Sequence, residues 1–60
     1  MRHLLDPSTL YDPDGDHRAA CGAPLTWDDT EREYTPRATA FTRSTTCGEC
    51  QATSIYRRRT

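Results

Sequence analysis

Two cysteines separated by two residues constrain this sequence more than any other feature. Cys47 and Cys50 stand at the ends of the segment Cys-Gly-Glu-Cys, and the sequence holds one further cysteine, Cys21, which a glycine follows. An odd number of cysteines leaves one thiol over in any disulfide framework. Structural zinc sites, in contrast, commonly take two ligands that are two to four residues apart. We therefore predict that the cysteines bind a metal, with Gly48 allowing the tight turn between two of them.

The sequence is poor in the side chains that build a hydrophobic core. Leucine, isoleucine, valine and phenylalanine together make up 6 of 60 residues, and valine is absent. A chain of this size is near the lower limit for folding alone and needs a further stabilising element. A structural zinc ion supplies one where thiols stay reduced. We expect one small zinc-stabilised, β-rich domain of zinc-ribbon-like hairpins over residues 1–56, followed by a basic tail over residues 57–60.

A tetrahedral zinc site needs a fourth ligand, and the sequence offers two histidines, His3 and His17. His17 is near Cys21 in the sequence, but an extended strand of four residues spans about 13 Å, whereas two ligands of one zinc ion are about 3.5 Å apart. Residues 11–16, Tyr-Asp-Pro-Asp-Gly-Asp, are a strong turn signal. A hairpin folded there brings His3 opposite Cys21. We expect His3 to be the fourth ligand and His17 to be exposed to solvent. The alternative is that His17 is the fourth ligand.

The candidate ligands and their neighbours resemble a group of small zinc-binding proteins encoded by actinobacteria and their phages. The shared pattern is His-Leu or His-Tyr near the start, then Ala-Cys-Gly, often a tryptophan, and then Thr-Cys-x-x-Cys. In this sequence it reads His3-Leu4, Ala20-Cys21-Gly22, Trp27 and Thr46-Cys47-Gly-Glu-Cys50, over most of the chain. The resemblance implies a zinc-binding mini-domain with the early histidine as a ligand. It implies no particular biological process.

The segment after Cys21 predicts a short helical turn. Pro24 argues against a helix at the start of this segment. Thr26, in contrast, is a weak N-cap for a helical turn over residues 27–33, whose first turn is acidic and so complements the helix dipole. Trp27 is expected in the core or as a shield over the zinc ion.

The C-terminal half predicts a strand and then a less certain last element. Residues 37–46 alternate in character and are rich in β-branched side chains, which indicates a strand that leads into Cys47. The segment after Cys50 fits either a last strand or a short C-terminal helix. In both cases Ile55 and Tyr56 are expected to pack on the metal site.

Charge is divided unevenly along the chain. Residues 1–36 hold eight acidic residues and three arginines, whereas residues 37–60 hold one acidic residue and five arginines. The two parts therefore carry −5 and +4, although the whole chain carries only −1. Arginine binds phosphate in a forked geometry and stacks on rings, so the C-terminal half predicts contact with DNA or RNA, or with a nucleic-acid machine. The expected contact residues are Arg43, Tyr56, Arg57, Arg58 and Arg59.

A second hypothesis is a zinc-stabilised protein adaptor without nucleic-acid contact. In that case Trp27 and the acidic stretch over residues 28–33 bind a protein partner. The two hypotheses differ in the surface that they use, since the acidic stretch lies in the N-terminal half and the arginines in the C-terminal half.

Neither catalysis nor a membrane location is expected. Thioredoxin-type chemistry needs a βαβ frame that this chain is too short to hold. A catalytic zinc keeps an open position in a shaped pocket, and an iron–sulfur cluster normally takes four thiolates. No segment approaches the ~20 apolar residues of a membrane span, and the N-terminal segment has no apolar region of the kind found in secretory signals. We expect a cytoplasmic binding protein that is not an enzyme.

Overall fold

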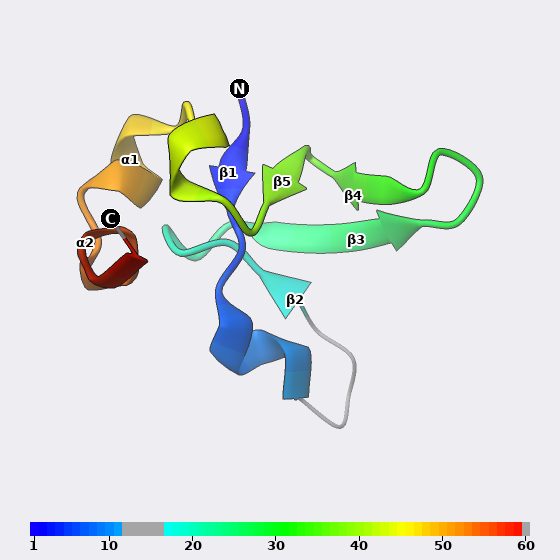
Figure 1. Cartoon of the computed structure of the whole chain (residues 1–60). Coiled ribbons are helices and arrows are strands. Elements are labelled where there is room, and N and C mark those ends of the chain that lie inside the picture. Colours follow the sequence, from blue (N-terminus) through cyan, green and yellow to red (C-terminus); the bar gives the residue numbers. More distant parts are fainter. Residues whose placement is uncertain (12–16, 60) are drawn as a thin grey trace.

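The structure, a computed structural model, describes residues 1–11 and 17–59 (Figure 1). The turn predicted between the two histidines falls on residues 12–16 and lies outside the described residues. In chain order the elements are β1 (His3–Leu4), the 3-10 helix η1 (Pro7–Tyr11), β2 (His17–Arg18), β3 (Pro24–Asp28), β4 (Glu33–Thr35), β5 (Ala38–Thr39), the 3-10 helix η2 (Thr42–Ser44), α1 (Gly48–Gln51) and α2 (Ser54–Arg59).

The short strand β1 lies at the centre of the fold. It pairs in parallel with β5, and the residue that follows it, Leu5, forms an antiparallel bridge with Ala19. A bridge between these two residues is the register in which His3 lies opposite Cys21, so this part of the hairpin prediction is confirmed. The antiparallel pairing is short because Pro7, which has no N–H to donate, begins η1.

The helical turn expected over residues 27–33 is wrong, because β3 and β4 form an antiparallel hairpin there. The Asp28 carboxylate accepts hydrogen bonds from the N–H groups of Thr30 (2.9 Å) and Glu31 (3.2 Å), which closes a turn instead of a helix. On the strands, Trp27 lies opposite Tyr34, and their rings meet edge to face with centroids 5.0 Å apart. β2 adds a third strand on the other side of β3.

The strand expected over residues 37–46 is wrong for most of its length. Only β5 is a strand, and the chain then turns through η2 before it reaches Cys47 and Cys50. Threonine hydroxyls direct this turn, since Thr39 Oγ1 accepts the Phe41 N–H (3.1 Å) and Thr45 Oγ1 donates to the Phe41 carbonyl (3.2 Å). Such local side-chain bonds compete with strand pairing.

The segment after Cys50, which fitted a strand or a helix, is helical. α1 and α2 lie together on one side of β1, and the β3–β4 hairpin extends away on the other side (Figure 1). Arg57 and Arg58 belong to the last turn of α2. Among the described residues, no helix has the length and apolar character needed to cross a membrane.

The hydrophobic core is small and contains two of the three cysteines. Ile55 and Tyr56, which were expected to pack on the metal site, pack from α2 against this core. Trp27 is 46% exposed, so the expectation that it lies in the core or shields the metal site is wrong. Its place on the β3–β4 hairpin, away from β1, accounts for this. The buried residues of the core are Leu4, Leu5, Ala19, Leu25, Cys47 and Cys50.

Candidate metal centre

The first candidate ligand, His3, is positioned by the pairing of β1 with its neighbours. Its N–H donates to the Arg37 carbonyl (2.9 Å), and its backbone lies opposite Ala38 of β5. The next residue, Leu4, is completely buried, so the strand cannot slide or rotate without exposing it. The imidazole is half-buried and is directed toward the cysteines.

Cys21 reaches the same place on a tight turn. The Ala20 N–H donates to the Leu4 carbonyl (2.7 Å), which ties the turn to β1, and the Gly22 N–H donates back to the Ala19 carbonyl (2.8 Å). Gly22 has a φ of 93°, a conformation that side chains with a Cβ disfavour. The turn therefore depends on this glycine, and it presents the Cys21 thiol toward His3.

Cys47 and Cys50 flank the first turn of α1. The N–H groups of Thr46 (2.9 Å) and Cys47 (3.1 Å) both donate to the Arg2 carbonyl, which ties the start of the helix to the chain just before β1. The prediction that Gly48 supplies a special turn conformation is wrong. Gly48 is an ordinary helical residue without positive φ, and the helical turn itself brings the two sulfurs together.

These three segments bring four ligand atoms into one group. The ligand atoms of His3, Cys21, Cys47 and Cys50 all lie within 4.8 Å of one another. The His3 Nδ1 atom lies 3.5 Å from the Cys21 sulfur and 3.7 Å from the Cys50 sulfur. A zinc ion with Zn–N of about 2.0–2.1 Å and Zn–S of about 2.3 Å at tetrahedral angles requires about 3.6 Å between nitrogen and sulfur. The observed distances match this requirement.

The surroundings of the thiols suit a cation. Burial raises the pKa of the Cys50 thiol to about 11, although the Leu4 N–H donates to this sulfur (3.4 Å) and partly offsets the effect of burial. The Cys50 backbone N–H lowers the pKa of the Cys47 thiol below its ordinary value. Cys50 is 0% exposed, so its thiolate has no access to water and needs a positive charge beside it. A metal ion within the group would supply that charge.

His17, the alternative fourth ligand, lies outside this group. In β2 it stands opposite Leu25, and its ring meets the edge of Tyr34 with centroids 5.5 Å apart. The ring is half-buried, and its Nδ1 atom is buried without a hydrogen-bond partner among residues 1–11 and 17–59. The expectation that His17 is exposed to solvent is therefore wrong, because pairing of β2 with β3 covers the ring.

The residues expected to contact nucleic acid lie on two elements. Arg43 lies on η2, and Arg57 and Arg58 lie on α2, and the side chains of all three are exposed. Arg59 ends α2. Tyr56 is half-buried against the core, so only part of its ring is available as a stacking face.

Sequence reasoning missed an exposed aromatic residue beside one of these arginines, Arg43. Phe41 is 64% exposed and lies two residues before Arg43. The signal was present in the segment Ala-Phe-Thr-Arg, where a single large apolar residue stands among small and polar ones. Its alternation with threonines instead suggested a strand with one face in the core.

Comparison of the chain with protein-family models, with curated proteins and with solved structures found no match. The function must therefore be inferred from the geometry of the four-residue group and from the surface around it.

Proposed function

We propose that this protein is a small structural-zinc module whose arginine-bearing C-terminal half binds nucleic acid. The observation that carries the zinc assignment is the group of three thiols and one imidazole, whose ligand atoms all lie within 4.8 Å of one another and whose His3 Nδ1 atom lies at near-tetrahedral distances from two of the sulfurs. Thiolate and imidazole ligands suit zinc, whereas carboxylate and water ligands suit magnesium or calcium. All four ligands come from the protein, which is typical of a closed structural site and leaves no open position for catalysis.

The proposed zinc ion has a clear structural task. The three segments that carry the ligands meet around β1, and the core between them contains few large apolar side chains. Zinc binding contributes about 10–16 kcal/mol to the folding free energy in small structural sites. A chain with so small a core does not stay folded when it loses that contribution. Removal of the metal is therefore expected to unfold the chain.

Native mass spectrometry tests the zinc assignment directly. We expect one zinc ion per chain, and a strong chelator should abolish the ordered circular dichroism and NMR spectra. Titration with Co²⁺ should give the visible absorption of a tetrahedral site with three thiolates. A chain that carries no metal, or that keeps its folded spectra in the chelator, would overturn the assignment.

The proposal that the protein binds nucleic acid rests on charge. Residues 37–60 carry five arginines and one acidic residue. Arg37 is paired with Glu33 at 3.1 Å, whereas Arg43 has no ion pair among the described residues. Exposed arginines in the C-terminal half of a chain whose N-terminal half is acidic favour one-sided, salt-dependent contact with phosphates.

Salt-dependent titration tests this part of the proposal. Replacing Arg57 and Arg58 with glutamine should flatten the slope of log K against log salt by about 1.4–1.8, at about 0.7–0.9 per phosphate contact. The double substitution Arg2→Gln and Arg32→Gln is the matched control, because it also removes two positive charges from exposed arginines, both in the acidic N-terminal half. An equal effect in the control would mean that net charge alone controls binding.

A protein-binding adaptor is the second candidate function, and the exposed Trp27 favours it. The ring is held in place by its edge contact with Tyr34 and by a 2.7 Å hydrogen bond from its Nε1–H to Asp29 Oδ1. Large aromatic residues of this kind often anchor protein interfaces. This candidate takes the lead if the zinc-loaded protein binds neither DNA nor RNA at low salt, and if a partner is captured by the protein but not by Trp27→Ala.

A further inference from the structure

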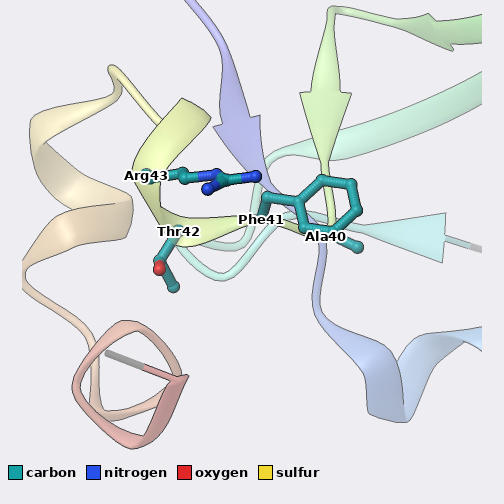
Figure 2. A pocket seen from close by; sticks show the side chains of 4 residues that line it. All are labelled: Ala40, Phe41, Thr42 and Arg43. Carbon is teal, nitrogen blue, oxygen red and sulfur yellow. The ribbon is translucent and has the colours of Figure 1, made fainter.

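The surface carries an open hollow of about 320 Å³ at the turn between β5 and η2. Four consecutive residues line it, Ala40, Phe41, Thr42 and Arg43 (Figure 2). It lies apart from the cluster of candidate metal ligands, none of which lines it. Because the lining comes from one turn, the shape of the hollow depends on how firmly that turn is held.

Hydrogen bonds hold Phe41 on both sides. Its N–H donates to Thr39 Oγ1 (3.1 Å), and its carbonyl accepts bonds from the Ser44 N–H (3.2 Å) and Thr45 Oγ1 (3.2 Å). Thr45 is buried, and its own carbonyl accepts a 2.8 Å bond from the Gln51 side chain of α1. The turn is therefore fixed to the helix that carries two of the cysteines, while the Phe41 ring remains 64% exposed.

The exposure of Phe41 is notable in this chain. The core is short of large apolar side chains, and this phenylalanine would add to it if the chain folded inward. Instead, hydrogen bonds to its N–H and carbonyl fix the Phe41 backbone at a place where the ring is exposed to solvent. Because the backbone is already fixed, a ligand that stacks on the ring has to order only the two side-chain torsions of Phe41, which is a small loss of conformational freedom.

Arg43 forms the second wall of the hollow. Its side chain extends from η2 toward the Phe41 ring (Figure 2). It is exposed, and within residues 1–11 and 17–59 it makes no ion pair. An aromatic face and an unpaired guanidinium two residues apart offer a stacking surface and a phosphate-binding group at the same place.

We propose that this hollow receives one unpaired nucleobase, which stacks on Phe41 while an adjoining phosphate binds Arg43. The nucleic acid of the proposed function is then single-stranded, because the face of a paired base is covered by its neighbours in a duplex. This inference rests on the proposed nucleic-acid binding and specifies its ligand. The positive charge of the C-terminal half complements a phosphate backbone, whereas an apolar peptide would leave Arg43 without a role.

Fluorescence anisotropy with the zinc-loaded protein tests the inference. The probes are a fluorescein-labelled oligothymidylate, the same oligonucleotide with abasic sites in place of the bases, and a mixed-sequence duplex of equal length. The variants are Phe41→Ala, Phe41→Leu as an apolar control, Phe41→Trp as an aromatic control, and Arg43→Gln. Zinc content and circular dichroism confirm that each variant is folded.

We expect Phe41→Ala and Phe41→Leu to weaken binding of the oligothymidylate about 5- to 150-fold, the usual loss for one stacked base. Phe41→Trp should retain the affinity, and the salt slope should stay unchanged in all three variants. Arg43→Gln should flatten that slope by about 0.7, since single strands release fewer counterions per contact than duplexes. The abasic probe should bind weakly and should not respond to Phe41→Ala.

Three results would overturn the inference in different ways. If the original protein binds oligothymidylate with a strong salt dependence but Phe41→Ala binds equally well, the proposed function stands and the stacking site is wrong. If the original protein binds none of the probes at low salt, the proposed nucleic-acid binding is wrong and the stacking site falls with it. Equal losses on duplex and single strand after Phe41→Ala would also contradict an unpaired base.

Discussion

Replacement of the two histidines by alanine, one at a time, is the sharpest test of the metal centre. His3 contributes a ring nitrogen that lies 3.5 and 3.7 Å from two cysteine sulfurs. His17 lies outside the ligand group, although it is closer to Cys21 in the sequence. Because the two substitutions remove the same side chain, a difference in zinc affinity reports the position of the ring.

The expected loss for His3→Ala follows from the number of ligands. Structural zinc binding contributes about 10–16 kcal/mol, so each of four ligands accounts for about 2.5–4 kcal/mol. At 1.4 kcal/mol for each tenfold change, His3→Ala should weaken zinc binding about 10²- to 10³-fold. The backbone bond from the His3 N–H to Arg37 survives the substitution, so β1 itself should still pair.

His17→Ala is expected to have little effect on zinc affinity. The substitution loses the edge contact with Tyr34, which is worth about 0.5–1.5 kcal/mol. It also removes the buried Nδ1 atom, which has no partner in the part of the chain that the structure describes and whose burial would then cost about 1–3 kcal/mol. These effects oppose each other, and neither involves a metal ligand.

Competition with a chromophoric chelator measures both affinities, and Co²⁺ spectra report the ligands. The original protein and His17→Ala should give the same tetrahedral spectrum, whereas His3→Ala should show a changed spectrum with one ligand replaced. Equal losses in the two variants, or a larger loss in His17→Ala, would refute the assignment of His3 and with it the register between β1 and the turn at Cys21.

Two further predictions concern protons and glycines. The logarithm of the zinc affinity should fall by about three for each pH unit below about pH 8, because three thiols with ordinary pKa values of about 8.5 regain protons in the unfolded, metal-free chain. The sign follows because the thiols are deprotonated in the zinc-bound state, so the stability that zinc supplies is present at higher pH and is lost as pH falls. Competition titrations at several pH values measure the slope of log affinity against pH. A slope near zero would contradict thiolate binding. Gly22→Ala should lower the free energy of unfolding of the zinc-loaded protein by about 1–2 kcal/mol, since its φ of 93° is strained for alanine. Gly48→Ala is the control and should raise the free energy of unfolding by up to about 1 kcal/mol, because Gly48 is helical and has open space around it. Equal effects of the two substitutions in thermal unfolding would contradict this account.

The sequence predicted the group of candidate ligands better than it predicted the elements that carry them. The spacing of Cys47 and Cys50 indicated two ligands of one metal ion. The geometry of a hairpin between residues 3 and 21 then placed His3 opposite Cys21. The strand expected over residues 37–46 was wrong, because threonine hydroxyls bond to the backbone there and turn the chain into η2. Propensity and alternation do not show which of these local bonds will form.

Tertiary pairing decided the conformation of residues 27–33. Their acidic residues and weak N-cap favoured a helical turn. A helix there would not have brought the Trp27 and Tyr34 rings into contact. The hairpin places these rings edge to face and lets the Asp28 side chain close the turn. The same pairing brings Trp27 to the surface, which is why the expectation that it is a core residue was wrong.

The sequence by itself determined that this chain needs an element other than a hydrophobic core, and that three thiols and one imidazole are available to provide it. Covalent spacing and donor chemistry decide those points, and they are independent of the fold. Only the tertiary structure decided which glycine forms the essential turn, how His17 is covered, and that Phe41 remains in solvent beside Arg43. Those outcomes depend on the competition between strand pairs and local hydrogen bonds, whose free energies are each too small to predict from the sequence.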